Sequence, residues 1–126
     1  MKYLSICLAL FICVSIASCS KKGDAGPVPH TIKFTATGTA SFTAVVSVIK
    51  TTSTTSTTLD TKTVAIGTSY DYSTILNSGD AVHFEIQTMG ENAVSYTITD
   101  NGTVAAQQTN KELGSFTKTT ADFSVN

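Results

Sequence analysis

The sequence contains no arginine and no tryptophan, and it carries little charge. Charged residues make up 13% of the 126 residues, and the formal net charge is -1. Nucleic acids and phosphate groups are bound by clustered cations and by the forked guanidinium of arginine, so the composition argues against both as ligands. The lack of tryptophan likewise weakens the case for an aromatic platform that stacks on sugars.

Cysteine is confined to the start of the chain, at Cys7, Cys13 and Cys19. Everything after Cys19 therefore lacks the thiols needed for a disulfide or a thiolate metal site. We expect this part of the chain to be stabilised by packing alone.

The common catalytic motifs are also missing. The sequence has no nucleophile elbow, no HExxH and no phosphate-binding glycine loop. Carboxylates are few, and most of them stand in or near expected turns, where turn formation accounts for them; those in or near turns are Asp60, Asp80, Glu91, Asp100 and Glu112. We therefore expect no enzyme and no cofactor, with a small hydrolase that uses paired carboxylates as the remaining alternative.

The N-terminal segment has the features of an export signal. Lys2 precedes an apolar stretch from Leu4 to Ala17, and its length of about 14 residues suits a signal peptide rather than a membrane span of about 20. The run Ile-Ala-Ser-Cys that ends at Cys19 resembles the cleavage site of bacterial lipoproteins. This resemblance implies a signal peptide at residues 1–18 and acyl chains, such as palmitate, on Cys19. The alternatives are an ordinary secretory signal and an uncleaved helix.

Residues 19–30 are expected to be the lipidated cysteine and a flexible tether, because they contain glycine, two prolines and no apolar periodicity. The lipid on Cys19 makes the membrane the expected partner. Ser20 stands where an aspartate would resemble an inner-membrane retention signal. We therefore expect a cell-envelope location, with the outer membrane favoured and its face left open.

From residue 31 onward, apolar and polar residues alternate with a period of two, which is typical of half-buried strands. The expected strands cover residues 31–37, 42–48, 64–66, 70–76, 82–87, 94–99, 103–109 and 115–125. Expected turns lie at Asn77–Asp80, Asp100–Gly102 and residues 110–114, and Asn-Gly between alternating runs is the strongest hairpin signal. No segment has the pattern of an amphipathic helix.

This pattern predicts an all-β domain over residues 31–126, an immunoglobulin-like antiparallel β-sandwich of about seven to eight strands. A small barrel is the alternative. The inward aromatic residues expected to form the core are Phe34, Phe42, Phe84, Tyr96, Phe116 and Phe123. Tyr70 and Tyr72 project to one side of a strand, and we expect them in the core rather than in a stacking platform.

Two segments are candidates for contact with a ligand. The hydroxyl-rich run Thr51–Thr58 is expected to be a solvated loop, with a partner-contacting hairpin tip as the alternative. His83 and Glu85 share the outward face of one strand. A metal site there needs a third ligand, but the neighbouring strand is expected to offer only Ser95, Thr97 and Thr99, which are poor ligands.

For His83 and Glu85 we therefore expect a solvated sheet face and no metal. His30, at the end of the tether, is not expected to take part in a site.

The order of the strand and turn signals resembles that of MmpS-type proteins, the membrane-anchored accessory subunits of mycobacterial lipid and siderophore exporters. The segments that carry the resemblance are Phe34–Ala40, Ser69–Tyr72, Ser78–Asp80, Val82–Gln87 and Asp100–Val104. It covers residues 31–126 and implies a small β-sandwich without catalytic residues. The chain departs from the family in having a lipid-anchor signal in place of a transmembrane helix, and in lacking the domain's cysteines.

Together these features lead us to expect a non-enzymatic, membrane-anchored envelope lipoprotein that binds or supports an envelope protein partner or another ligand. The alternative is a structural or adhesive surface subunit, similar in logic to a pilin. Such a subunit lacks a strand or donates one, whereas residues 115–125 are expected to complete the sheet.

Overall fold

A computed structural model describes residues 26–126, which fold into eight strands and no helix. The signal peptide, Cys19 and most of the tether lie outside the described residues. The strands are β1 (Pro29–Gly38), β2 (Phe42–Ile49), β3 (Ser56–Val64), β4 (Tyr70–Asn77), β5 (Ala81–Thr88), β6 (Asn92–Asp100), β7 (Thr103–Leu113) and β8 (Lys118–Ser124). Within residues 26–126 no helix is long and apolar enough to cross a membrane.

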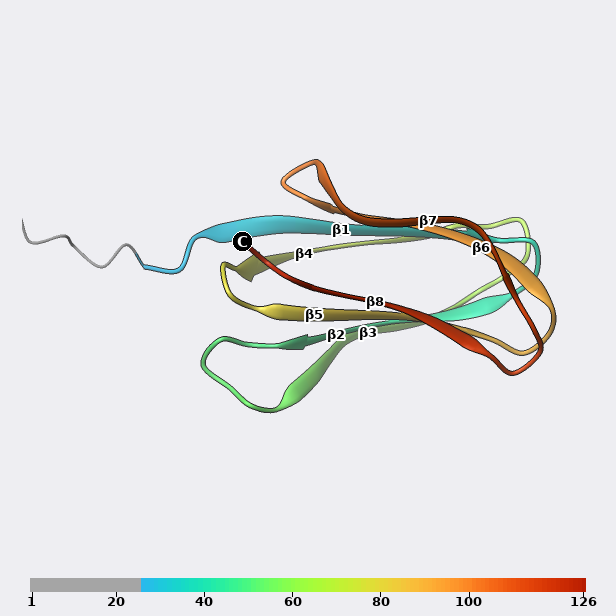
Figure 1. Ribbon diagram of the computed structural model, residues 1–126, viewed down its shortest axis with the longest axis horizontal. Helices are drawn as coiled ribbons and strands as arrows, with labels where there is room; N and C mark the ends of the chain where they lie inside the picture. The colour runs from blue at the N-terminus through green and yellow to red at the C-terminus, as the bar shows by residue number, and fades with distance from the viewer. Residues whose placement is uncertain (1–25) are drawn as a thin grey trace, which may run out of the picture.

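The strands form two four-stranded antiparallel sheets that pack face to face (Figure 1). Sheet A has the order β4-β1-β6-β7, and sheet B has the order β3-β2-β5-β8. The β2–β3 and β6–β7 connections stay within one sheet, and every other connection between these strands crosses to the opposite sheet. The predicted all-β, immunoglobulin-like antiparallel β-sandwich is confirmed, and β8 completes sheet B by pairing with β5.

The core lies between the sheets and is built around the ring of Phe84. The rings of Phe34, Tyr70 and Tyr96 lie 5.5, 5.9 and 5.6 Å from it, centroid to centroid. Such aromatic pairs add to the free energy gained by burying their large apolar surfaces. Phe34, Phe42, Phe84 and Tyr96 are buried as predicted, and Phe123 is half-buried against the same cluster.

The prediction that Phe116 belongs to the core is wrong, because its side chain is 82% exposed. β8 begins only at Lys118, so Phe116 lies in the β7–β8 turn and not in the alternating strand. Its φ of 57° places it in the left-handed region. A hydrogen bond from Thr88 N–H to the Thr117 carbonyl joins this turn to the end of β5.

Several predicted boundaries also differ from the structure. β3 starts at Ser56, so the last three of the eight residues of the expected loop Thr51–Thr58 are strand. Ile66 lies beyond the end of this strand and is exposed. β7 continues to Leu113 through the expected turn at residues 110–114, and β1 starts at Pro29. The edge strands β3 and β7 are held mainly by backbone hydrogen bonds to one neighbouring strand. They bury few side chains, so the alternation of apolar and polar residues that predicts a strand is weak in them.

The two sharp turns at Asn77–Asp80 and Asp100–Gly102 are confirmed. Asn101 and Gly102 both have positive φ, 48° and 84°, as a two-residue hairpin turn requires. Gly79 has a φ of 89° in the turn that leads into β5.

Candidate functional site

A row of charged side chains crosses the outer face of sheet B, centred on His83 and Glu85 of β5. Their neighbours are Asp122 and Lys118 of β8, because β5 pairs with β2 and β8. The expectation that Ser95, Thr97 and Thr99 flank them is wrong, since these residues belong to β6 in sheet A. The chain crosses to the other sheet after β5, so the next strand in sequence is not the next strand in space.

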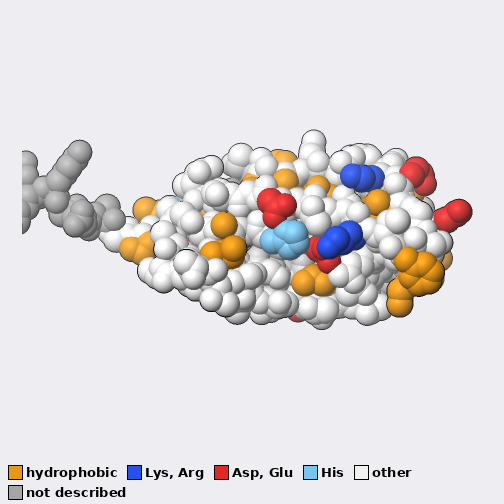
Figure 2. Space-filling view, turned by 60° about the horizontal axis from the view of Figure 1, so that its bottom comes forward, with side chains coloured by type: hydrophobic (Ala, Val, Ile, Leu, Met, Phe, Trp, Pro, Cys, Tyr) orange, Lys and Arg blue, Asp and Glu red, His pale blue; other side chains and the backbone are white. Residues whose placement is uncertain are grey.

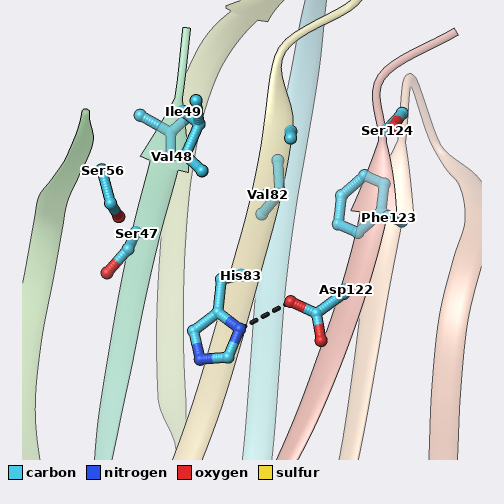
Figure 3. Close-up of a pocket in the computed structure, with 10 residues that line it drawn as sticks. Ser47, Val48, Ile49, Ser56, Val82, His83, Asp122, Phe123 and Ser124 are labelled. Atoms are coloured by element: carbon cyan, nitrogen blue, oxygen red, sulfur yellow. Dashed lines mark hydrogen bonds and ion pairs between the residues drawn. The ribbon is translucent and has the colours of Figure 1, made fainter. Parts of the chain in front are cut away.

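His83 is held in place by a carboxylate from the adjacent strand. Its Nδ1 lies 2.6 Å from Oδ1 of Asp122, directly across in the β5–β8 register (Figure 3). Its Nε2 lies 3.8 Å from Oε2 of Glu85. Asp122 is exposed, so we expect this pair to orient the imidazole and to add little to the free energy of unfolding.

Glu85 is the buried member of the row. The Lys118 ammonium lies 2.7 Å from its Oε2, and the Gln87 side-chain amide donates to its Oε1. The hydrogen bonds from Gln87 and Lys118 outweigh burial and hold the pKa of Glu85 below its usual value. Glu85 is therefore ionised and paired at neutral pH.

Ser47 of β2 is the cross-strand partner of His83, so Ser47, His83 and Asp122 lie in one line across three strands. These residue types form nucleophilic triads in hydrolases when the serine hydroxyl is bonded to the histidine. In the described structure the Ser47 hydroxyl lies 3.5 Å from the Thr58 hydroxyl, and His83 Nε2 faces Glu85. β2 and β5 are both inner strands, whose backbone N–H groups bond to neighbouring strands and not to a developing oxyanion.

A shallow hollow of about 300 Å³ lies on this face beside the His83–Asp122 pair (Figure 3). Three serine hydroxyls, from Ser47, Ser56 and Ser124, line it together with Ile49. This volume is at the lower end of the range for small-molecule sites. The hollow offers hydroxyl, imidazole and carboxylate groups for hydrogen bonds, and its other lining residues, among them Ile49 and Phe123, are apolar.

A metal ion bound by this row of charged side chains would have two ligands, His83 Nε2 and a carboxylate oxygen of Glu85. Within residues 26–126 there is no group of three or more histidine, cysteine or acidic side chains placed to hold a metal ion. Glu85, which would join His83 Nε2, is already held by Lys118. The lack of a cofactor remains an expectation from the sequence.

His30 lies in β1 and not at the end of a flexible tether, and that it takes no part in a functional site stays a prediction. Its Nδ1 lies 2.6 Å from Oδ1 of Asp100, and its Nε2 lies 3.2 Å from the Ser78 hydroxyl. His30 thus ties the start of β1 to the β4–β5 and β6–β7 turns. The alternation of Ile32 and Phe34 continues back to His30, and this was the available sequence signal.

Asp80 is buried in the β4–β5 turn and organises the same end of the sandwich. It accepts hydrogen bonds from the Asn77 and Thr51 N–H groups, the Lys50 ammonium and the Thr51 hydroxyl, at 3.0 to 3.1 Å. Burial opposes ionisation, but these donors outweigh it and lower the pKa of Asp80 to about 2. The turn prediction for Asp80 holds, whereas Asp60 and Glu112 lie within β3 and β7 and not in turns.

No protein-family model, no curated protein and no solved structure matches this chain. The resemblance to MmpS-type proteins therefore stays a prediction from the sequence. The function has to be argued from the residues and the geometry described above.

Proposed function

We propose that this protein is a lipid-anchored lipoprotein of the cell envelope whose β-sandwich is a non-enzymatic binding or accessory module. The observation that carries the proposal is the run Ile-Ala-Ser-Cys ending at Cys19, behind a basic start and an apolar stretch. A complete folded domain begins at Pro29, about ten residues beyond Cys19. A short tether of this kind holds a domain close to a bilayer.

The geometry of the described residues supports a binding module over an enzyme. The side chains best suited to acid–base chemistry are paired with one another. His83 is paired with Asp122, Glu85 with Lys118, and His30 with Asp100. Ser47, although aligned with His83, is not bonded to it in this structure, so it lacks the activation that a nucleophile needs.

A structural subunit that assembles through its strands is the second candidate, and one observation favours it. β7 is an edge strand of eleven residues, and it carries no charge from Thr103 to Asn110. Unprotected edges of this kind pair with other chains. Two register shifts interrupt the β6–β7 ladder, however, and bulges protect an edge against such pairing. Fibres or ladders of the purified full-length protein would favour this second candidate.

The test of the lipoprotein proposal is the processing of Cys19 in bacterial cells that express the full chain. Labelling with an alkyne fatty acid should mark the wild type. Cys19→Ala should leave unprocessed, unlabelled precursor, whereas globomycin, which blocks cleavage after the thiol is lipidated, should leave unprocessed precursor that is labelled. Cys13→Ala, a matched change within the signal peptide, should be labelled and processed normally. Normal maturation and membrane retention of Cys19→Ala would overturn the proposal.

A further inference from the structure

Three loops lie at the end of the sandwich remote from Pro29 (Figure 1), and each carries an exposed large apolar side chain. Ile66, Met89 and Phe116 come from the β3–β4, β5–β6 and β7–β8 connections, and they are 69%, 74% and 82% exposed. Met89 and Phe116 line one hollow of about 220 Å³, together with Thr88 and Thr117. Figure 2 shows apolar side chains gathered at this right-hand end. We call Met89 and Phe116 the apolar tip.

Phe116 is held in a backbone conformation that suits it poorly. Of the described non-glycine residues with positive φ, two are Asn101 and Asn110, and asparagine tolerates this region. Phenylalanine has no polar side-chain group that could stabilise the backbone at φ 57° by a local hydrogen bond. Its exposed ring is not stabilised by burial either. Strain retained without a packing gain points to a contact made outside the chain.

The surroundings of the apolar tip are acidic. Glu91 follows Met89 by two residues, and Glu112 lies in register with Ala93 at the start of β6. Neither carboxylate forms an ion pair within residues 26–126. Lys118 beside Phe116 is paired with Glu85, which leaves Lys111 as the nearby cation on β7.

We propose that the apolar tip inserts into an apolar pocket of a partner protein whose rim carries lysine or arginine. A protruding aromatic side chain seated in a pocket is a common centre of binding energy in protein interfaces. The acidic rim of Glu91 and Glu112 would give charge complementarity and favour a basic partner. This inference names the surface that the proposed binding module uses, but it does not depend on lipidation of Cys19.

Two other occupants fit the apolar tip less well. A second copy would bring two acidic tips together, so repulsion between like charges opposes this contact. Anionic lipid headgroups would be repelled by the same carboxylates. If Cys19 is lipidated, the tip also lies at the end of the domain opposite to the tether.

The test is photo-crosslinking in cells that express the full-length chain, with benzoylphenylalanine at position 116 or 89. Ile75, which is 69% exposed and pairs with Thr31 near the other end, is the matched control position. We expect both tip positions to yield the same polypeptide, crosslinked within a segment that combines apolar residues with lysine or arginine. Glu91→Lys with Glu112→Lys should reduce the yield at position 116 at least fivefold, and acidic substitutions in the mapped partner rim should restore it.

Several results would overturn this proposal: no product at either tip position, equal yields at position 75, crosslinks to a second copy or to lipid, or a yield unaffected by charge reversal. Fatty-acid labelling of the same samples reports on Cys19 separately. If crosslinking at the tip fails while Cys19 is labelled, only this inference is overturned. If Cys19 is unlabelled while the tip crosslinks are specific, only the lipid anchor is overturned.

Discussion

The Tyr70 hydroxyl donates a 2.7 Å hydrogen bond to Oδ2 of Asp60, joining β4 of sheet A to β3 of sheet B. Tyr70 is fully buried against Phe84, and a register shift opposite Val46 and Ser47 brings Asp60 to the inner face. Burial and the neighbouring carboxylate raise the pKa of Tyr70, so the hydroxyl stays protonated and keeps donating. One polar bond thus ties two edge strands together.

Tyr70→Phe should lower the free energy of unfolding by about 1–2 kcal/mol, because it leaves Asp60 without this donor. Urea denaturation followed by circular dichroism measures the change. Tyr72→Phe is the matched control, since Tyr72 is half-buried and its hydroxyl has no hydrogen bond to another described residue. Equal effects of the two substitutions would contradict a role for the bond.

Asp80→Asn should cost about 3 kcal/mol of stability, because the buried carboxylate accepts four hydrogen bonds that the amide cannot reproduce. The pKa of Asp80 is lowered from 3.8 to about 2, so its contribution of about 2 kcal/mol is complete above pH 4 and is lost as the pH falls toward 2. The stability difference between wild type and variant should therefore shrink below pH 4. Asp122→Asn, at an exposed site, should change stability by less than about 0.5 kcal/mol. A difference that stays constant from pH 7 to 2 would contradict this explanation.

Phe116→Gly should stabilise the isolated protein by about 1 kcal/mol, because glycine adopts positive φ without the steric cost that phenylalanine has. For a domain of this size the melting temperature should rise by about 4–8 °C. Phe116→Ala keeps a Cβ and should show no such rise. A loss of stability in Phe116→Gly would mean that the ring is packed in solution, against the account of an exposed tip.

Glu85 and Lys118 should be coupled by about 0.5–1 kcal/mol in a double-mutant cycle of Glu85→Gln and Lys118→Met. The value is modest because Lys118 is mostly exposed, even though Glu85 is buried. The pKa of Glu85 is lowered, so the coupling is present at neutral pH and should fade as the pH drops below the usual range for glutamate. Additive single substitutions at pH 7 would show that the pair contributes nothing.

The inner strands were well predicted from the sequence, because burial on one face imposes a strict alternation. Val82, Phe84 and Ile86 of β5 show it clearly, and the Asn101–Gly102 turn has a strong local signal. The edge strand β3 was placed poorly, since Ser56–Thr58 pair with β2 through their backbones and bury little. Phe116 was wrongly predicted to lie in the core, because hydrophobicity alone does not distinguish a buried ring from an exposed one.

The outer face of sheet B was only half predictable. His83 and Glu85 could be assigned to one face from their spacing, but Asp122 and Lys118 come from a strand about 35 residues further along the chain. Nothing local in the sequence says that β8, rather than β6, lies beside β5. Likewise, the two ends of the sandwich and the tip formed by Met89 and Phe116 emerge only from the order of strands in space.

The most direct test of the account is the mass of the N-terminal peptide of the protein purified from bacterial membranes. We expect Cys19 to be the first residue, with a diacylglyceryl group on its sulfur and a further acyl chain on its amine. A mature protein that begins elsewhere, or an unmodified Cys19, would contradict it.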